Sequence, residues 1–280
     1  IGAFIYSLIH HIMQLIKKQL FWLLLISIPT ALKAQDFALQ QLEASPRHHE
    51  WVKVANGERN VHCFVAYPEV SNNAPAVIVI HENRGLTDWV RSLTDQLAAA
   101  GFLAIAPDLL SDFDEKRRKT DDFENSDAAR NGIYELNPDQ VTADLNAVYH
   151  YIAQVPASTG QVSVMGFCWG GSQSFRFATN NDQISAALVF YGTAPNEAEV
   201  FQRIKAPVYG FYGGNDQRVN ATIAQTEEWM KAADKTFEYE IYPGAGHAYM
   251  RAGDDPAGSP ENKAATTASW ERIRQILTQE

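Results

Sequence analysis

The sequence predicts an α/β fold in which a mostly parallel central sheet carries helices on both of its faces. Continuous apolar runs recur along the chain, as expected for strands that are buried on both sides of a parallel sheet. Segments with helical periodicity alternate with these runs, and neither an internal repeat nor a low-complexity linker interrupts them. The 280 residues, of which 46% are hydrophobic and 20% charged, have the composition of a globular protein.

The elements are expected in a regular order along the chain. The fold opens with an antiparallel hairpin, because the strand-like segments 50–55 and 61–67 flank the turn signal Asn56-Gly57. Six apolar runs then predict buried strands at residues 76–80, 103–106, 162–165, 186–191, 208–212 and 239–242. Five periodic segments predict helices at residues 88–100, 139–154, 172–179, 221–233 and 262–277.

One stretch, residues 111–137, departs from this alternation. It is rich in charged residues and has only weak periodicity. We expect it to pass over the top of the sheet, where loops form pockets.

The first 34 residues are interpreted as a signal peptide. They contain no Asp or Glu, and the basic pair Lys17-Lys18 precedes the apolar run of residues 20–28. That run has the length of a signal-peptide core and is shorter than the ~20 apolar residues that a transmembrane helix needs. Cleavage is expected near the small residue Ala34, which predicts an exported protein, periplasmic or secreted, without stable membrane insertion. An uncleaved amphipathic anchor is the alternative.

The predicted domain boundary follows from this leader. Translation is expected to start at Met13, just before the basic pair, so that residues 1–34 comprise upstream residues and the signal peptide. Residues 35–280 are then expected to form a single domain, because the alternation of strands and helices continues without a linker.

Charge and residue counts argue against a nucleic-acid-binding protein, a disulfide scaffold and a metal site. The chain has 23 Lys and Arg against 33 Asp and Glu, and its formal net charge of -10 argues against a broad surface for nucleic acid. Two cysteines, Cys63 and Cys168, are too few for a disulfide scaffold or a cysteine-based zinc site, although they could form one bridge. The histidines His48, His49 and His150 lack ligand spacing to any cluster of carboxylates or cysteines, so no metal is expected.

A cysteine stands at the centre of a glycine-rich turn. The segment Gly166-Phe167-Cys168-Trp169-Gly170-Gly171 follows a predicted strand and precedes a predicted helix, which is the context of a nucleophile elbow with cysteine in place of serine. The glycines suit a strained turn, because a Cβ at the flanking positions would collide with the neighbouring strand or helix. The N-terminus of the following helix favours a thiolate and an oxyanion. A buried cysteine without a chemical role is the structural alternative.

Two further residues follow in the order that a catalytic triad needs. Asp216 comes after the predicted strand 208–212, and His247 lies in a glycine-rich loop after the predicted strand 239–242. In α/β hydrolases the nucleophile, the acid and the histidine occur in this chain order, each at the end of a strand region. The sequence therefore predicts an α/β-hydrolase fold with a triad of Cys168, Asp216 and His247.

At these residues the sequence resembles the dienelactone hydrolase family. The resemblance covers roughly Trp51 to Leu277, and the cysteine in the elbow is its specific part, since most α/β hydrolases have serine there. The matching segments are residues 77–86, 104–109, 166–171, 213–216 and 246–247. The resemblance implies a hydrolase without cofactor that opens dienelactones or related esters and lactones through an acyl-cysteine intermediate.

The resemblance also implies roles for residues beside the triad. The family's glutamate in the loop after the third strand matches Glu82, which is expected to contact Cys168 and to take part in its activation when substrate enters. The backbone N–H groups of Asn83 and Trp169 match the family's oxyanion hole. A salt bridge between Glu82 and Arg84 is the structural alternative for the glutamate.

Substrate-binding residues are expected on three segments. The resemblance implies arginines that hold the substrate carboxylate, and Arg251 matches one of these positions. Arg84 and Tyr249 are further candidates for substrate contact. A second carboxylate-binding arginine is expected within residues 111–137. The residues that compete for this role are Arg117, Arg118 and Arg130.

The predicted function is hydrolysis of a small carboxylate-bearing ester or lactone. Cys168 would attack the carbonyl, His247 would act as general base and then as general acid, and Asp216 would orient the imidazole.

The expected partner is a small molecule, and the protein is expected to be a monomer or a weak homodimer. Two alternatives stay open: a non-catalytic binding protein of the same fold, and a structural bridge between Cys168 and Cys63, although Cys63 is expected in the core.

Overall fold

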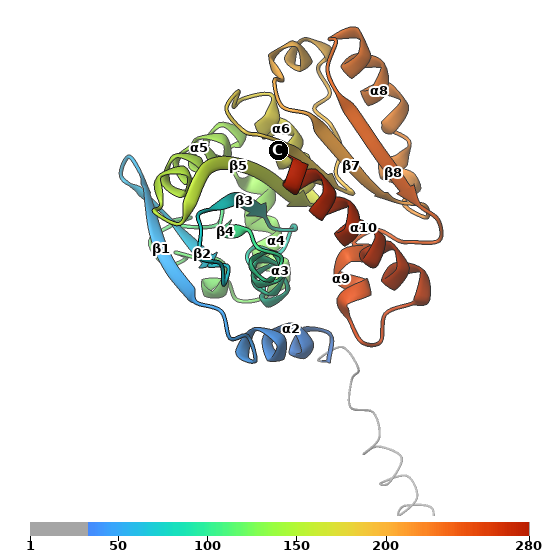
Figure 1. Ribbon diagram of the computed structural model, residues 1–280. Helices are drawn as coiled ribbons and strands as arrows, with labels where there is room; N and C mark the ends of the chain where they lie inside the picture. Colours follow the sequence, from blue (N-terminus) through green and yellow to red (C-terminus); the bar gives the residue numbers. More distant parts are fainter. Residues whose placement is uncertain (1–32, 280) are drawn as a thin grey trace, which may run out of the picture. The chain divides into compact units, whose positions relative to one another are not determined.

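An eight-stranded sheet lies at the centre of the fold (Figure 1). The structure, a computed structural model, describes residues 33–279, and the chain divides into two compact units, residues 1–36 and 37–280, of which the second contains the sheet. The strands are β1 (His49–Asn56), β2 (Arg59–Ala66), β3 (Ala74–Ile80), β4 (Leu103–Pro107), β5 (Ser158–Phe167), β6 (Ala187–Phe190), β7 (Val208–Gly213) and β8 (Phe237–Tyr242). They lie in the order β1-β2-β4-β3-β5-β6-β7-β8. The β1–β2 and β2–β4 pairs are antiparallel and all other neighbours are parallel.

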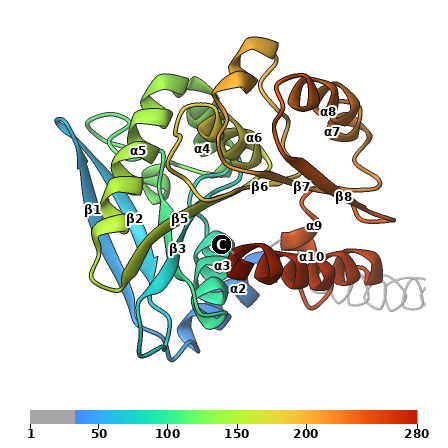
Figure 2. The same cartoon turned by 45° about the horizontal axis from the view of Figure 1, so that its top comes forward.

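Helices cover both faces of this sheet, with α3 and α10 on one side and α5, α6 and α8 on the other (Figure 2). The α-helices are α2 (Lys33–Glu43), α3 (Asp88–Ala99), α4 (Ser126–Glu135), α5 (Pro138–Gln154), α6 (Trp169–Ala178), α7 (Gln217–Asn220), α8 (Ile223–Ala232), α9 (Tyr249–Asp254) and α10 (Pro260–Gln279). Residues 33–279 also contain two 3₁₀ helices, η2 (Thr120–Asp122) and η3 (Ala198–Arg203).

The alternation of side chains along β3 explains the two layers. Val77 and Val79 pack in a buried cluster with residues of α3 and α10, whereas Ile78 and Ile80 pack in a second cluster with residues of α5 and α6. Successive side chains of a strand point to opposite faces, so a strand covered on both sides must be apolar throughout. The predicted hairpin, the mostly parallel sheet and the helices on both faces are confirmed.

Four of the described helices are not predicted by the sequence pattern, namely α2, α4, α7 and α9. The buried residues of α4 are only Ala129, Gly132 and Ile133, which give too narrow an apolar stripe for a clear helical period. α9 has only 6 residues, fewer than a periodic pattern needs. α4 lies within residues 111–137, the stretch that the sequence predicts as an excursion over the sheet.

Several predicted helices begin one to three residues from their observed starts. α6 begins at Trp169 rather than at residue 172, because the strand-to-helix turn is completed by Cys168 alone. The predicted helix 221–233 is preceded by the short helix α7, and α8 begins only at Ile223. The first difference matters for function, because it places a helix N-terminus directly after the cysteine.

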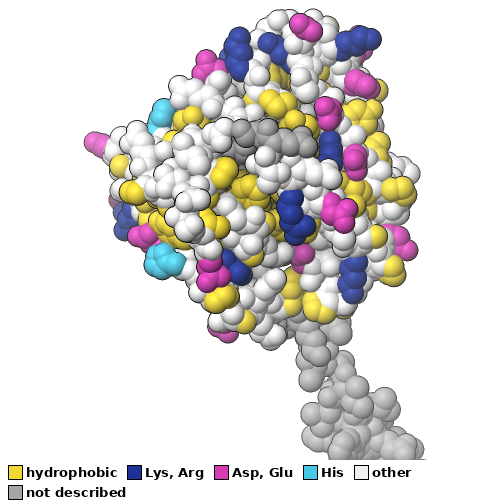
Figure 3. Space-filling view, in the orientation of Figure 1, with side chains coloured by type: hydrophobic (Ala, Val, Ile, Leu, Met, Phe, Trp, Pro, Cys, Tyr) yellow, Lys and Arg dark blue, Asp and Glu magenta, His cyan; other side chains and the backbone are white. Residues whose placement is uncertain are grey.

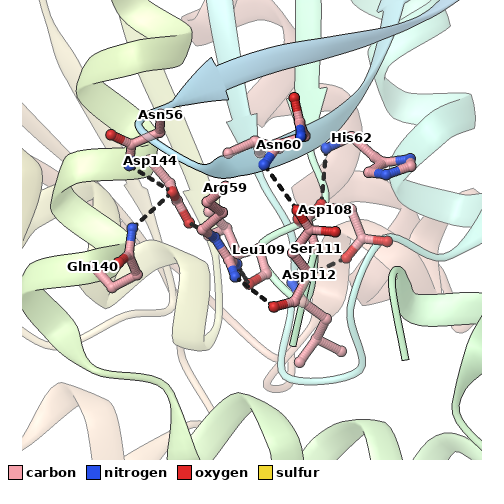
Figure 4. Close-up of polar contacts among 12 residues, drawn as sticks. Asn56, Arg59, Asn60, His62, Asp108, Leu109, Ser111, Asp112, Gln140 and Asp144 are labelled. Atoms are coloured by element: carbon pink, nitrogen blue, oxygen red, sulfur yellow. Dashed lines mark hydrogen bonds and ion pairs between the residues drawn. The ribbon is translucent and has the colours of Figure 1, made fainter. Parts of the chain in front are cut away.

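A polar network holds the loop that follows β4 (Figure 4). Arg59 Nε lies 2.9 Å from Asp144 Oδ2, and the Asp144 side chain is only 1% exposed. The two terminal nitrogens of Arg59 donate to the backbone carbonyls of Asp112 (3.1 Å) and Leu109 (3.2 Å). Hydrogen bonds that involve a charged group contribute about 1.5–3 kcal/mol each. Residues 108–112 are therefore tied to the β1–β2 hairpin and to α5.

Charged side chains of both signs are interspersed on the face shown in Figure 3, so no single sign dominates that face. Among the helices that the structure describes, none combines the length and the apolar character needed to cross a bilayer. The predicted signal peptide and the start at Met13 lie outside the described residues, and the cleavage near Ala34 is not tested by them. These three points stay predictions.

Candidate active site

Three predicted site residues lie at one edge of the sheet, each beyond the end of a strand. Cys168 directly follows β5, Asp216 follows β7, and His247 follows β8. Because β5, β6, β7 and β8 run parallel to their neighbours, their carboxyl ends lie at the same edge. Residues that are far apart in the sequence are thereby brought to one place, as the chain order of the three residues predicts.

The turn that presents Cys168 is strained and closely packed. Cys168 has φ 56° and ψ -115°, outside the regions that most L-residues occupy. A Cβ on Gly166 would lie 1.9 Å from the carbonyl oxygen of Gly170, and a Cβ on Gly170 would lie 2.3 Å from that of His81. The N–H of Cys168 donates to the carbonyl oxygen of Phe190 at 3.0 Å. Positions 166 and 170 therefore require glycine, because neighbouring backbone atoms leave no room for a Cβ there.

Cys168, His247 and Asp216 form a continuous hydrogen-bonded array. His247 Nε2 lies 3.1 Å from Cys168 Sγ, and His247 Nδ1 lies 2.5 Å from Asp216 Oδ2. Asp216 is buried, and its other oxygen accepts a hydrogen bond from the N–H of Val219 at 3.4 Å, which fixes the carboxylate. The hydrogen bond to Cys168 and the hydrogen bond to Asp216 outweigh the effect of burial and raise the pKa of His247 to about 9. His247 therefore carries a proton at neutral pH.

Both cysteines are free thiols, so the structure does not contain the alternative Cys63–Cys168 bridge. Cys63 is fully buried on β2 and belongs to the core, where its Sγ lies 3.5 Å from the carbonyl oxygen of Val61. Burial raises the pKa of the Cys63 thiol well above its ordinary value, which makes it unreactive. Cys168, in contrast, is partly exposed at the sheet edge.

Glu82 forms an ion pair with Arg251 rather than with Arg84. Arg251 Nε donates to Glu82 Oε2 at 2.8 Å, and the two side chains are 40% and 8% exposed, respectively. Burial by itself lowers the pKa of Arg251, but the negative charge of Glu82 outweighs it and raises this pKa above its ordinary value. The alternative partner of Glu82, Arg84, has an exposed side chain. The expected contact between Glu82 and Cys168 stays a prediction.

The two expected oxyanion donors lie at the edge of the sheet that carries the cysteine. Trp169 is the first residue of α6, where backbone N–H groups have no partner within the helix. Asn83 lies in the loop after β3, and β3 is the parallel neighbour of β5. The side-chain amide of Asn83 donates to the hydroxyl of Tyr134 at 3.1 Å, which links this loop to α4.

A pocket of about 170 Å³ opens beside Cys168. Several of its polar lining residues are not singled out by the sequence pattern: Tyr134 of α4, Ser172 of α6, Thr193 after β6, and Arg218 of α7. Arg218 is exposed and makes no ion pair among the described residues. The sequence does contain a signal for Arg218, because this residue follows Asp216 by only two positions.

Tyr191 is a strained residue in the wall of this pocket. Its φ of 39° is unusual for a bulky side chain, and its ring lies 5.1 Å from the ring of His247. Its hydroxyl is buried and has no hydrogen-bond partner among the described side chains and backbone. Burial raises the pKa of Tyr191 well above its ordinary value, so the group stays a neutral donor. Strain and an unpaired donor beside His247 are typical of a functional site.

Tyr249 is not in the pocket. Its side chain is 0% exposed, and its hydroxyl lies 2.7 Å from that of Ser269 inside the core. This burial corrects the expectation that Tyr249 contacts substrate. Because α9 begins at Tyr249, the first residue of the helix turns inward and only Arg251, half a turn later, reaches the site.

The arginines of the charged stretch are largely engaged elsewhere. Arg117 pairs with Asp114, and Arg118 pairs with Asp112. Arg130 is exposed and lies 6.0 Å from the ring of Tyr134. None of the three lines the pocket beside Cys168. Within residues 33–279, no group of three or more His, Cys, Asp or Glu side chains is arranged to hold a metal ion.

Comparison with known proteins decides the family. The model of the dienelactone hydrolase family matches residues 61–280. The chain belongs to the dienelactone hydrolase family. Two relatives, from Salmonella typhimurium and Saccharolobus solfataricus, are both named "Putative carboxymethylenebutenolidase". Each is 30% identical to this chain, over 228 and 248 residues, which cover 77% and 78% of this chain and 82% and 93% of theirs.

A solved structure supports the fold of this dienelactone hydrolase family member. It is named "Crystal Structure of Putative Dienelactone Hydrolase" and comes from Klebsiella pneumoniae. It is similar to this chain with a TM-score of 0.74 and 25% sequence identity, and the match covers 84% of this chain and 100% of that one. The predicted family, the α/β-hydrolase fold and the class of enzyme, an ester or lactone hydrolase, are confirmed.

Proposed function

We propose that this member of the dienelactone hydrolase family hydrolyses a small carboxylate-bearing ester or lactone through an acyl-cysteine intermediate. The observation that carries the proposal is the array of Cys168, His247 and Asp216 beside an open pocket. The sulfur is partly exposed, hydrogen-bonded to an imidazole and placed at a helix N-terminus. Each of these features favours a nucleophilic thiolate.

Formation of the Cys168 thiolate is coupled to substrate binding through Glu82. The raised pKa of His247 depends first on its contact with the Cys168 sulfur and then on Asp216, so the imidazolium stabilises the thiolate once it forms. Glu82 is the available carboxylate, but in the resting protein it is paired with Arg251. A substrate carboxylate that binds Arg251 competes with Glu82 for the guanidinium. The released Glu82 carboxylate is then available to accept the thiol proton.

The remaining steps return every group to its starting state. The Cys168 thiolate adds to the carbonyl carbon, and the oxyanion is held by the N–H groups of Asn83 and Trp169. The C–O bond breaks, and His247 gives its proton to the leaving oxygen. Water then adds to the thioester while His247 takes a proton from it, and the C–S bond breaks to release the acid. The thiolate recovers its proton from Glu82, which pairs again with Arg251.

The charges around Cys168 favour an anionic substrate. Arg251 pairs with Glu82 and is close enough to Cys168 for the negative charge of the sulfur to raise its pKa. Arg218 lines the pocket without a carboxylate partner among the described residues. A guanidinium binds a carboxylate with two parallel hydrogen bonds. The name carboxymethylenebutenolidase, given to the relatives, describes a lactone with a carboxymethylene group. Substrate recognition by Arg251 fits that chemistry.

A comparison of matched substrates tests this recognition. We expect Arg251→Ala to lower kcat/KM about 10- to 100-fold for an ester that carries a carboxylate, because a charged hydrogen bond is lost. The slower hydrolysis of the neutral ester of the same shape should not fall, because that ester neither binds Arg251 nor displaces Glu82 from it. The readout is the ratio of the two kcat/KM values. Arg218→Ala shows in the same way whether the pocket arginine contributes.

Arg203→Ala, an exposed arginine on η3, is the control and should leave the ratio unchanged. An equal loss for both substrates in Arg251→Ala would contradict carboxylate recognition by this residue. A ratio that falls only in Arg218→Ala would indicate that the substrate carboxylate binds Arg218 in the pocket and not Arg251.

We also propose export of this protein, which the leader-like residues 1–34 support. Expression of the chain from Met13 in a bacterium, followed by fractionation and N-terminal sequencing, tests it. A first residue near Gln35 in the exported fraction is expected. A first residue upstream of Leu32 would contradict the cleavage site, and retention of the full chain in the cytoplasm would contradict export.

A further inference from the structure

His81 is a fully buried histidine that the proposed chemistry does not use. It lies directly after β3, next to Glu82, and its side chain has 0% exposure. Its ring nitrogens have two backbone partners: Nδ1 lies 2.8 Å from the carbonyl oxygen of Glu82, and the N–H of Leu109 lies 3.2 Å from Nε2. The ring also stacks on Trp169, with the centroids 5.6 Å apart and an interplanar angle of 15°.

These partners define the protonation state of the ring. A backbone N–H can only donate, so Nε2 must accept from Leu109, and Nδ1 must carry the proton that it donates to Glu82. Burial lowers the pKa of His81, although the negative charge of Asp108 opposes this, so the neutral form is favoured. The neutral ring with its proton on Nδ1 is the only form that satisfies both backbone groups.

The carbonyl group that His81 binds belongs to the same peptide unit as a proposed oxyanion donor. The C=O of Glu82 and the N–H of Asn83 share one planar peptide unit, in which they point in opposite directions. A hydrogen bond that fixes the C=O therefore fixes the direction of the N–H. It also polarises the peptide, which strengthens the N–H as a donor.

We propose that His81 is a positioning residue for the oxyanion hole, holding the Asn83 N–H through the carbonyl group of Glu82 and packing on Trp169, which supplies the second N–H. This inference rests on the proposed function, because an oxyanion hole acts only when a carbonyl group is attacked. His81 contacts both segments that supply the donors. One side chain therefore sets the geometry of both.

The other side of the ring is anchored to a rigid part of the fold. Leu109, which donates to Nε2, lies in the loop that Arg59 holds through the Leu109 carbonyl group, as Figure 4 shows. Thr120 binds Asp108 with its backbone N–H (2.7 Å) and its hydroxyl (2.8 Å), which fixes the residue before Leu109. His81 thus connects the oxyanion hole to the hairpin and to α5 through buried hydrogen bonds.

The test compares two substitutions with different hydrogen-bonding ability. His81→Phe keeps a ring that can stack on Trp169 but removes both hydrogen bonds. His81→Gln has one N–H donor group and one acceptor, separated about as far as the two ring nitrogens. We expect kcat for a small aryl ester that carries a carboxylate to fall about 10- to 100-fold in His81→Phe with little change in KM, and to recover most of its value in His81→Gln.

Alkylation of Cys168 by iodoacetamide separates the oxyanion hole from the thiol. The thiolate displaces iodide from a saturated carbon, so no oxyanion forms, and the alkylation rate should be unchanged in His81→Phe. His150→Phe, an exposed histidine on α5, is the control and should change neither rate. Circular dichroism checks the fold, and if His81→Phe does not fold, His81→Leu takes its place in the comparison.

Two results would overturn the inference. One is an unchanged kcat in the folded variant that lacks both hydrogen bonds. The other is a fall of the alkylation rate in proportion to kcat, because His81 would then act on the thiol and not on the oxyanion hole. Failure of the proposed function is distinct from both, since the wild-type protein would then show no ester hydrolysis that depends on Cys168.

Discussion

Cys168→Ala is expected to lower kcat for ester hydrolysis by at least about 10³-fold and to leave the fold intact. The substitution removes the sulfur that forms the bond to the acyl group, and the oxyanion donors alone supply only residual rate enhancement. Cys168 is partly exposed, so the loss of Sγ opens no buried cavity. The backbone strain at φ 56° is the same for alanine as for cysteine, so the substitution does not change it. Steady-state kinetics and thermal unfolding measure the two effects separately.

The second cysteine provides the matched control. Cys63→Ala removes a fully buried sulfur on β2, so it should lower the free energy of unfolding while leaving kcat unchanged. Unchanged turnover in Cys168→Ala would eliminate the acyl-cysteine mechanism. A wild-type protein without esterase activity, whose Cys168 is not alkylated faster when substrate analogues are added, would point to a non-catalytic binding protein of this fold.

Asp216→Asn is expected to have the second large effect, a loss of about 10²- to 10⁴-fold in kcat. The substitution keeps the size of the side chain and the acceptor for the N–H of Val219, so the loop stays in place. It removes the carboxylate that lies 2.5 Å from His247 Nδ1 and that holds the imidazole in its working orientation. Activity should therefore fall far more than stability.

The same substitution has a defined pH signature. Asp216 is one of the groups that raise the pKa of His247 to about 9, so this pKa should fall in Asp216→Asn. An unfolded histidine titrates near ~6.5. Because the folded pKa is the higher one, the stabilisation is fully present below about pH 6.5 and is lost as the pH rises through about 9. The difference in unfolding free energy between wild type and variant should shrink over that range.

NMR titration of the His247 ring measures the shift directly, and urea unfolding at several pH values measures the linkage. Asp139→Asn, whose aspartate side chain is 91% exposed, is the control and should change neither kcat nor the His247 titration. An unaltered His247 pKa in Asp216→Asn would contradict the role given to this carboxylate.

The fold follows from the sequence because burial on both faces makes each parallel strand a continuous apolar run. The run at 76–80 predicts β3 for this reason, and a turn signal predicts the hairpin of β1 and β2. Helix α4 is not predicted, because it packs with a narrow apolar stripe over one loop and not over the sheet. Local pattern thus predicts the elements with a long or broad apolar run. It misses short helices such as α9, although Tyr249 and Met250 of that helix lie in the main core.

The meeting of Cys168, Asp216 and His247 could be predicted because the fold imposes their order. Parallel strands end at one edge of the sheet, and chain order then identifies the three residues without any knowledge of distances. The partner of Glu82 could not be chosen in this way. Arg84 is two residues away in the sequence, whereas Arg251 is brought to Glu82 only when α9 follows the loop after β8. Sequence proximity favours the wrong partner here.

The sequence by itself determined the class of fold, the family and the candidate triad of Cys168, Asp216 and His247. These depend on periodicity and on order along the chain. Only the tertiary structure decided that Glu82 pairs with Arg251 and that Arg218 lines the pocket. It also placed Tyr249 in the core and revealed His81 bound to the carbonyl group of Glu82. The physical reason is that contacts between distant segments depend on the directions of side chains at strand and helix ends, which no local pattern encodes.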